Sequence, residues 1–294
     1  MNREHEAKFR ILAAMAMFGT IGLFVRGISL PSSLIALVRG VVGSLFLLAV
    51  LRLRGAYLDR AAIRANGKKL ILSGACLGFN WIFLFEAYRY TTVSTATLCY
   101  YMAPILIILT SPLLLKERLT VRKLCCVGAA LVGMVCISGV LRTGIPSVEE
   151  SRGILLGLAA AVIYAAIVLL NKGIRGIPAF DRTVVQLSVS AVTLLPYCLV
   201  TLQGQELRLD PVGALLLLVV AVLHTGVCYY LYFGAITEVS AQTAAIISYV
   251  DPVVAVLLSV LVLRESMGVI DVLGAVLILG AALVSELPGR KGAD

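Results

Sequence analysis

Residues 100–117 read YYMAPILIILTSPLLLKE, and residues 248–265, which lie 148 positions further along the chain, read SYVDPVVAVLLSVLVLRE. Both stretches contain a tyrosine followed three residues later by a proline, and both end on a basic residue and a glutamate. A pattern that returns after half of a 294-residue chain indicates an internal duplication. The two copies lie in apolar surroundings, so the duplication concerns the hydrophobic part of the chain.

The whole chain has the composition of a membrane protein. Hydrophobic residues make up 60% of it and charged residues only 14%, and its mean hydropathy is +1.01. A helix needs about 20 apolar residues to cross the hydrocarbon core of a bilayer. Hydropathy predicts such helices at residues 9–27, 34–52, 68–88, 94–113, 121–140, 153–171, 182–202, 212–234, 240–262 and 268–286.

The longest break between these segments, at residues 141–152, divides the chain into two halves. We therefore expect one structural domain made of two five-helix repeats, residues 1–140 and residues 153–286. Because five is an odd number, the second repeat enters the membrane upside down, as in many secondary transporters. The predicted fold is an all-α bundle of ten transmembrane helices in two inverted repeats.

The basic residues predict how this bundle is oriented. With the N-terminus inside, the cytoplasmic segments hold eighteen Lys and Arg and the outer connectors hold six. Lys and Arg accumulate on the cytoplasmic side of membrane proteins, so both termini are expected in the cytoplasm. The net charge of +9 is thereby explained without nucleic acid as a partner.

Motifs for enzymatic or nucleotide-driven chemistry are absent from the sequence. It contains no GxxxxGK[ST] loop, no HExxH and no GxSxG, and its seven cysteines lack the CxxC spacing of a zinc site. We expect no enzyme, no cofactor and no metal site, and energy that comes from solute or ion gradients.

The doubled motifs resemble the EamA-type branch of the drug/metabolite transporter superfamily. The resemblance rests on paired sequences in the two halves, namely AYRYTTVSTA at 87–96 with AITEVSAQTA at 235–244 and LKERLT at 115–120 with LRE at 263–265. It also rests on HTGVCYYLY at 224–232 in the second half. It implies a carrier of small metabolites, including amino acids, that works through a central cavity by alternating access. One departure is Asp251, where the family often has Glu before the proline, and the shorter side chain changes how far the carboxylate reaches into the cavity.

Asp251 is the foremost candidate for the chemistry of the cavity. It lies eleven residues into its predicted helix, roughly 16 Å deep at 1.5 Å per residue. A carboxylate at that depth must be paired, hydrated or protonated, so it either contacts substrate or a proton or forms a structural ion pair. Arg39 is the candidate partner, and it could equally stabilise the helix bundle or bind a carboxylate of the substrate. The repeat counterpart of Arg39 is Gln186.

The remaining candidates are aromatic and polar side chains at similar depth. Aromatic walls with a few polar anchors are typical of small-molecule pockets, although each such residue could also serve packing alone. The candidates for the cavity, beside Arg39 and Asp251, are Phe18, Asn80, Trp81, Tyr101, Tyr164, His224, Tyr229 and Tyr249.

The sequence thus predicts a multi-pass protein of a bacterial inner membrane that exports amino acids or related metabolites. A small-molecule substrate, membrane lipid and H⁺ as coupling ion are the expected partners, and the protein could be a monomer or a homodimer. The alternative is a membrane-embedded enzyme or scaffold without transport activity. Reactive side chains clustered at one membrane face would favour that alternative, whereas a cavity lined by both repeats would favour transport.

Overall fold

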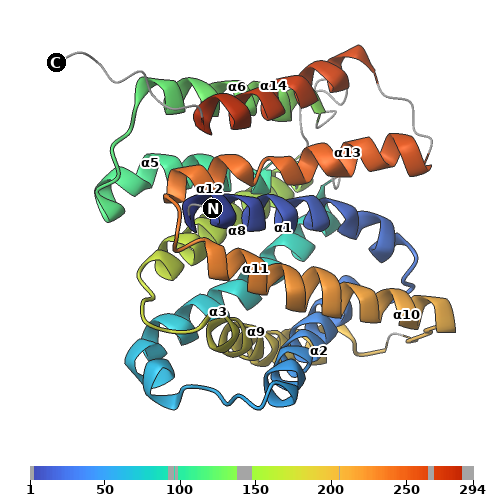
Figure 1. Cartoon of the computed structure of the whole chain (residues 1–294). Coiled ribbons are helices and arrows are strands. Elements are labelled where there is room, and N and C mark those ends of the chain that lie inside the picture. Colours follow the sequence, from blue (N-terminus) through green and yellow to red (C-terminus); the bar gives the residue numbers. More distant parts are fainter. Residues whose placement is uncertain are drawn as a thin grey trace.

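The computed structural model describes residues 3–91, 96, 99–137, 148–204, 206–263 and 268–286. All secondary structure in these residues is helical, and the helices form one bundle (Figure 1). In the first half they are α1 (Arg3–Arg26), α2 (Ser32–Leu53), α3 (Arg60–Tyr90), α5 (Ala103–Leu115) and α6 (Val121–Ile137). In the second half they are α8 (Val148–Lys172), α9 (Ala179–Thr201), α10 (Pro211–Val219), η1 (Val220–Val227), α11 (Cys228–Ala235), α12 (Ala241–Ile247), α13 (Val250–Leu263) and α14 (Val269–Glu286).

The helices begin and end where local chemistry requires it. Asp59 caps α3, because its side chain accepts hydrogen bonds from the backbone nitrogens of Ala61 and Ala62. Pro104 lies in the first turn of α5, where its missing N–H is not needed. Lys116 ends α5 in the left-handed conformation, with φ of 57°.

Six helical stretches within the described residues are long and apolar enough to cross a membrane. They are Arg3–Val25, Ser32–Leu53, Arg60–Tyr90, Ser151–Lys172, Ala179–Thr201 and Pro211–Ala235. Ala103–Leu115 is a shorter apolar helix. The all-helical fold of a membrane protein is confirmed, whereas ten crossings and cytoplasmic termini stay predictions. The break expected at 141–152 is shorter than predicted, because α8 already begins at Val148; residues 141–147, Arg264 and Glu265 lie outside the described residues.

Three predicted helices have an internal structure that hydropathy did not indicate. The segment expected as one helix at residues 240–262 is divided into α12 and α13 by a turn at Ser248 and Tyr249. The segment expected at 212–234 contains the π-helical stretch η1, in which one extra residue per turn widens the helix. A third segment, expected as one helix at residues 94–113 of the first half, is likewise interrupted by a turn at Tyr101 and Met102, after which α5 begins.

The helices pack so that each contact has an equivalent contact between the counterpart helices of the other half. α3 packs against α8 and α9, while α11 packs against α1 and η1 packs against α2. α1 packs against α13, while α8 packs against α5. α2 contacts α9, α5 contacts α12, and α6 contacts α14, the last pair lying side by side along one edge of the bundle (Figure 1). Replacing each helix by its counterpart in the other half leaves this set of contacts unchanged.

Candidate functional site: a central cavity

A cavity of about 350 Å³ lies among α1, α2, α3, α5, α8, α11 and α13. It receives side chains from both halves of the chain. Its aromatic, polar and charged lining consists of Phe18, Arg39, Trp81, Phe85, Tyr88, Tyr100, Tyr101, Tyr164, Tyr229, Ser248 and Asp251. Seven of the side chains expected from the sequence therefore meet here, namely Phe18, Arg39, Trp81, Tyr101, Tyr164, Tyr229 and Asp251. Their role in binding stays a prediction.

Two helix starts contribute to the lining of the cavity. α5 follows a turn at Tyr101 and Met102, and α13 follows the turn at Ser248 and Tyr249. Asp251 lies in the first turn of α13, directly before Pro252. A helix N-terminus carries partial positive charge and unpaired N–H groups, so it favours a carboxylate at this place. The position of Asp251 is thus stabilised by a helix start rather than exposed in the middle of a continuous helix.

Asp251 also contacts the other helix start. Its side chain interacts with the side chain of Tyr101, which comes from the turn before α5. Its backbone oxygen lies so close to Gly19 of α1 that a Cβ atom there would be 2.6 Å away. The carboxylate is therefore held at a point where α1, α5 and α13 meet.

Arg39 lies on the wall of the cavity formed by α2 and is only 8% exposed. Its Nε donates a hydrogen bond of 2.9 Å to the Thr225 hydroxyl of η1, and its guanidinium carbon lies 4.9 Å from the centre of the Trp81 ring. Within the described part of the chain no ion pair joins Arg39 to Asp251 or to another carboxylate. A buried guanidinium without a counter-ion is suited to an anionic group of a ligand.

Aromatic rings form most of the remaining wall. Tyr229 lies edge-on to Phe18, with 5.2 Å between ring centres, and 6.1 Å from Trp81. The ring centres of Tyr100 and Tyr164 lie 5.5 Å apart. The Tyr164 hydroxyl donates to Tyr232 over 3.0 Å, which fixes its ring against α11. The wall can therefore hold the apolar body of a solute and also stabilise a cation.

Three residues that the sequence proposed for the cavity do not line it. The Asn80 amide donates a 2.7 Å hydrogen bond to the backbone oxygen of Ala160, which joins α3 to α8. His224 is completely buried in η1, with its Nε2 2.7 Å from the Thr20 hydroxyl. Tyr249 is completely buried, and its hydroxyl donates to the backbone oxygen of Tyr101 over 3.4 Å. All three connect helices behind the lining.

Gln186, the counterpart of Arg39, lies in a separate buried network. Its amide nitrogen donates to the Ser73 hydroxyl over 2.8 Å and to the Asn171 oxygen over 3.0 Å. The Asn171 amide also donates to Ser73 over 3.0 Å. This network joins α3, α8 and α9 away from the cavity, so the two halves use equivalent positions for different purposes.

Three polar members of the lining, Tyr88, Tyr100 and Ser248, are not among the candidates named from the sequence. Ser248 stands at the position of Tyr100 in the aligned repeats, so the repeat could have identified it. Tyr88 lies near the end of α3 inside the AYRY stretch, where it would pass for an interfacial tyrosine. Among the described residues, no group of three His, Cys, Asp or Glu side chains is placed to hold a metal ion.

The sequence model of the EamA-like transporter family matches residues 7–139 and, a second time, residues 151–286. The chain belongs to the EamA-like transporter family. This family is part of the drug/metabolite transporter superfamily, and membership supports a transporter role for a multi-pass membrane protein. The resemblance noted from the doubled motifs is thereby confirmed.

Several other proteins resemble the chain over most of its length. A protein of Bacillus subtilis described as "Uncharacterized transporter YxxF" is 28% identical over 97% of this chain and 91% of its own length. An "Uncharacterized transporter" of Archaeoglobus fulgidus is 25% identical over 94% of both chains. A solved crystal structure shares the fold, with a TM-score of 0.83, 22% identity and coverage of 96% of this chain and 98% of its own.

Proposed function

We propose that this EamA-family protein is a secondary-active transporter that exports small zwitterionic metabolites, amino acids foremost, across a bacterial inner membrane. The observation that carries the proposal is a single cavity that holds a guanidinium, Arg39, and a carboxylate, Asp251, with no ion pair between them. An amino acid presents the complementary pair of charges. Its carboxylate would bind to Arg39 and its ammonium group to Asp251.

The size and walls of the cavity support a solute of this class. A volume of about 350 Å³ lies at the lower end of the range for small-molecule pockets. The aromatic lining provided by Trp81, Tyr100, Tyr164 and Tyr229 suits an apolar or aromatic side chain. We therefore expect preference for amino acids with bulky apolar side chains over short polar ones.

Alternating access is the mechanism that the packing favours. Each contact between helices has an equivalent made by their counterparts in the other half. A second arrangement, in which the two halves swap conformations, would therefore preserve the same kinds of helix contact. The breaks before α5 and between α12 and α13 lie at the cavity, where a change of helix direction would open or close it. Phe85 and Tyr88, from the C-terminal part of α3, also line the cavity.

A flux assay tests the function. Purified protein in liposomes would be assayed for counterflow of a panel of labelled amino acids, with organic acids and amines as single-charge comparisons. We expect counterflow of zwitterions, a reduction of about tenfold or more in Arg39→Gln, and normal flux in Arg208→Gln. Arg208 is a matched control, because its exposed side chain pairs with Glu206 outside the cavity. A folded protein that moves none of these solutes would refute the proposal.

Proton coupling through Asp251 is the energy source that we propose for export. A carboxylate in an apolar, helix-capped position can exchange a proton for the substrate ammonium group. In Asp251→Asn, flux driven by a pH gradient should be lost, whereas counterflow at equal pH should persist at higher substrate concentrations, because the amide oxygen still accepts a hydrogen bond from the ammonium group but binds it more weakly. If the variant retains the pH dependence of the natural protein, the coupling site lies elsewhere.

A further inference from the structure

A second and larger cavity, of about 790 Å³, lies among the connectors rather than between the helix centres. Residues 174–178 of the loop between α8 and α9 form one side, and Leu115 at the end of α5 and Glu117 after it form another. Asp59 before α3 and Thr237 after α11 complete the rim. It shares no lining residue with the central cavity. Any ligand held here would occupy a site of its own.

The two carboxylates of this cavity are already engaged by backbone amides. Asp59 accepts hydrogen bonds from the first turn of α3. Glu117 accepts from the backbone nitrogens of Ala241 and Gln242, over 2.8 and 3.3 Å, and so holds the start of α12. The nearby Asp181 accepts from the backbone nitrogen of Asp59 over 2.7 Å. These acidic groups therefore hold helix starts and connectors through backbone hydrogen bonds, and Glu117 also attracts Lys172 electrostatically.

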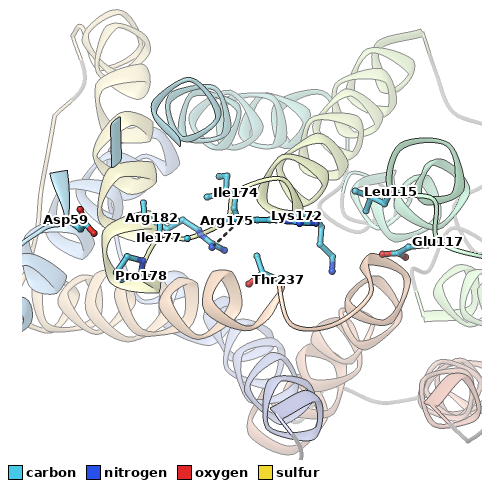
Figure 2. Close-up of a pocket in the computed structure, with 11 residues that line it drawn as sticks. Asp59, Leu115, Glu117, Lys172, Ile174, Arg175, Ile177, Pro178, Arg182 and Thr237 are labelled. Carbon is cyan, nitrogen blue, oxygen red and sulfur yellow. Dashed lines mark hydrogen bonds between the residues drawn. The ribbon is translucent and has the colours of Figure 1, made fainter. Parts of the chain in front are cut away.

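Arg182 is the basic group that most clearly lacks an anionic partner. It is only 4% exposed, and it donates to the backbone oxygen of Phe233 over 2.7 Å and weakly to that of Ile174 over 3.4 Å. Its Nε has no hydrogen-bond partner among the described residues. Figure 2 shows its side chain reaching into the space between Asp59 and Lys172. A buried guanidinium with an unused N–H is incomplete without an acceptor.

Two further cations line the same space. Lys172, at the end of α8, donates to the backbone oxygen of Val239 and faces the cavity between Arg182 and Glu117 (Figure 2). Arg175 is exposed on the rim. Among the described residues, none of these three basic side chains forms an ion pair with a carboxylate. The cavity thus presents three positively charged side chains, together with two carboxylates that already accept hydrogen bonds from backbone N–H groups.

We propose that this second cavity binds a phosphate group, with the guanidinium of Arg182 as its main ligand and Lys172 and Arg175 beside it. A phosphate carries up to two negative charges and several acceptor oxygens, which match the donors of a guanidinium fork and an ammonium group. The phosphate belongs either to a soluble phosphorylated solute or to the headgroup of an anionic lipid. The site is separate from the transport cavity, so it exists whether or not amino acids are the cargo.

Binding to the purified full-length protein tests the site. Inorganic phosphate would be titrated calorimetrically in a neutral detergent, at constant ionic strength held with chloride. We expect saturable binding that Arg182→Gln weakens about tenfold to a hundredfold and that Arg208→Gln leaves unchanged. Because Arg182 also anchors Phe233, the variant Arg175→Gln serves as a second test. Its side chain is exposed, so the fold should persist while binding weakens severalfold.

A lipid experiment distinguishes the two sources of phosphate. Delipidated protein would be returned to nanodiscs of pure phosphatidylcholine or of phosphatidylcholine with about one third phosphatidylglycerol, an anionic lipid. The lipid that the protein retains would then be measured by native mass spectrometry. Binding of inorganic phosphate that persists with phosphatidylglycerol present indicates a soluble ligand. Retention of phosphatidylglycerol that Arg182→Gln abolishes indicates a headgroup. Neither form of binding, or binding that both arginine variants leave intact, would overturn the proposal.

Discussion

At the scale of single residues, Arg39 shows how the cavity combines charge and geometry. Its Nε bond to Thr225 and its position over Trp81 use the planar guanidinium, which an ammonium group cannot imitate. Arg39→Lys therefore keeps the charge but should weaken zwitterion binding about tenfold. Trp81 is the only tryptophan of the chain and lines the cavity, so its fluorescence reports binding of non-aromatic amino acids directly. An unchanged titration curve would show that charge alone suffices.

Asn80 permits the opposite experiment, because it neighbours Trp81 but faces a helix contact. Its hydrogen bond to Ala160 is buried, and such bonds contribute about 1 kcal/mol between membrane helices. Asn80→Ala should lower the thermal unfolding temperature in detergent, while the affinity measured through Trp81 stays the same. A loss of affinity with normal stability would instead return Asn80 to the binding site, where sequence reasoning had placed it.

The site residues that the sequence marks most clearly are charged groups whose burial in an apolar helix costs free energy. A carboxylate before a proline and an arginine inside an apolar helix have few structural uses, and Asp251 and Arg39 indeed line the cavity. Hydropathy could not decide which way a side chain faces. His224 and Tyr249 lie at suitable depth but point between helices, and that difference depends on helix rotation, which only the packed structure defines.

At the scale of the helices, α3 and α9 approach each other through small residues of α3. A Cβ atom on Gly78 would lie 2.8 Å from the Thr193 Cβ and 2.9 Å from the Ser190 backbone oxygen, closer than atoms tolerate. Gly78→Ala should therefore force the two helices apart and cost about 1–3 kcal/mol. Thermal unfolding and flux, measured on the same preparation, would both fall.

Gly67 provides the matched control on the same helix. A Cβ atom there meets nothing within 4 Å, so Gly67→Ala adds only the better helix propensity of alanine, worth up to about 1 kcal/mol. This variant should be as stable as the natural protein or slightly more so. If both variants behaved alike, the contact between α3 and α9 would not be as close as described.

The helices themselves were predictable because each apolar segment is long and bounded by polar connectors. The division of residues 240–262 into α12 and α13 was not, although Pro252 hinted at it, because every residue around the turn is compatible with a continuous apolar helix by hydropathy. The π-helical stretch η1 leaves no mark in composition either. Both features depend on contacts with helices distant in sequence, such as the Arg39 bond to Thr225.

At the scale of the whole molecule, the remaining prediction from sequence is orientation. The excess of Lys and Arg in alternate connectors predicts cytoplasmic termini, which places the connector before α3 inside and the connector between α9 and α10 outside. The phosphate site would then face the cytoplasm, because its lining comes from connectors on the lysine-rich and arginine-rich side. The orientation therefore decides which cellular pool of phosphate could reach it.

Cysteine labelling settles that orientation. In a background with the seven natural cysteines replaced, Ala61→Cys places a single thiol on the exposed first turn of α3, next to the connector before it, and Glu206→Cys places one in the connector between α9 and α10. In intact spheroplasts, a membrane-impermeant maleimide should label position 206 and leave position 61 unlabelled until the membrane is opened. The reverse pattern would invert the bundle, and the phosphate site would then sample the periplasm. Equal labelling of both positions in sealed cells would contradict a fixed orientation, and with it the charge rule as its cause.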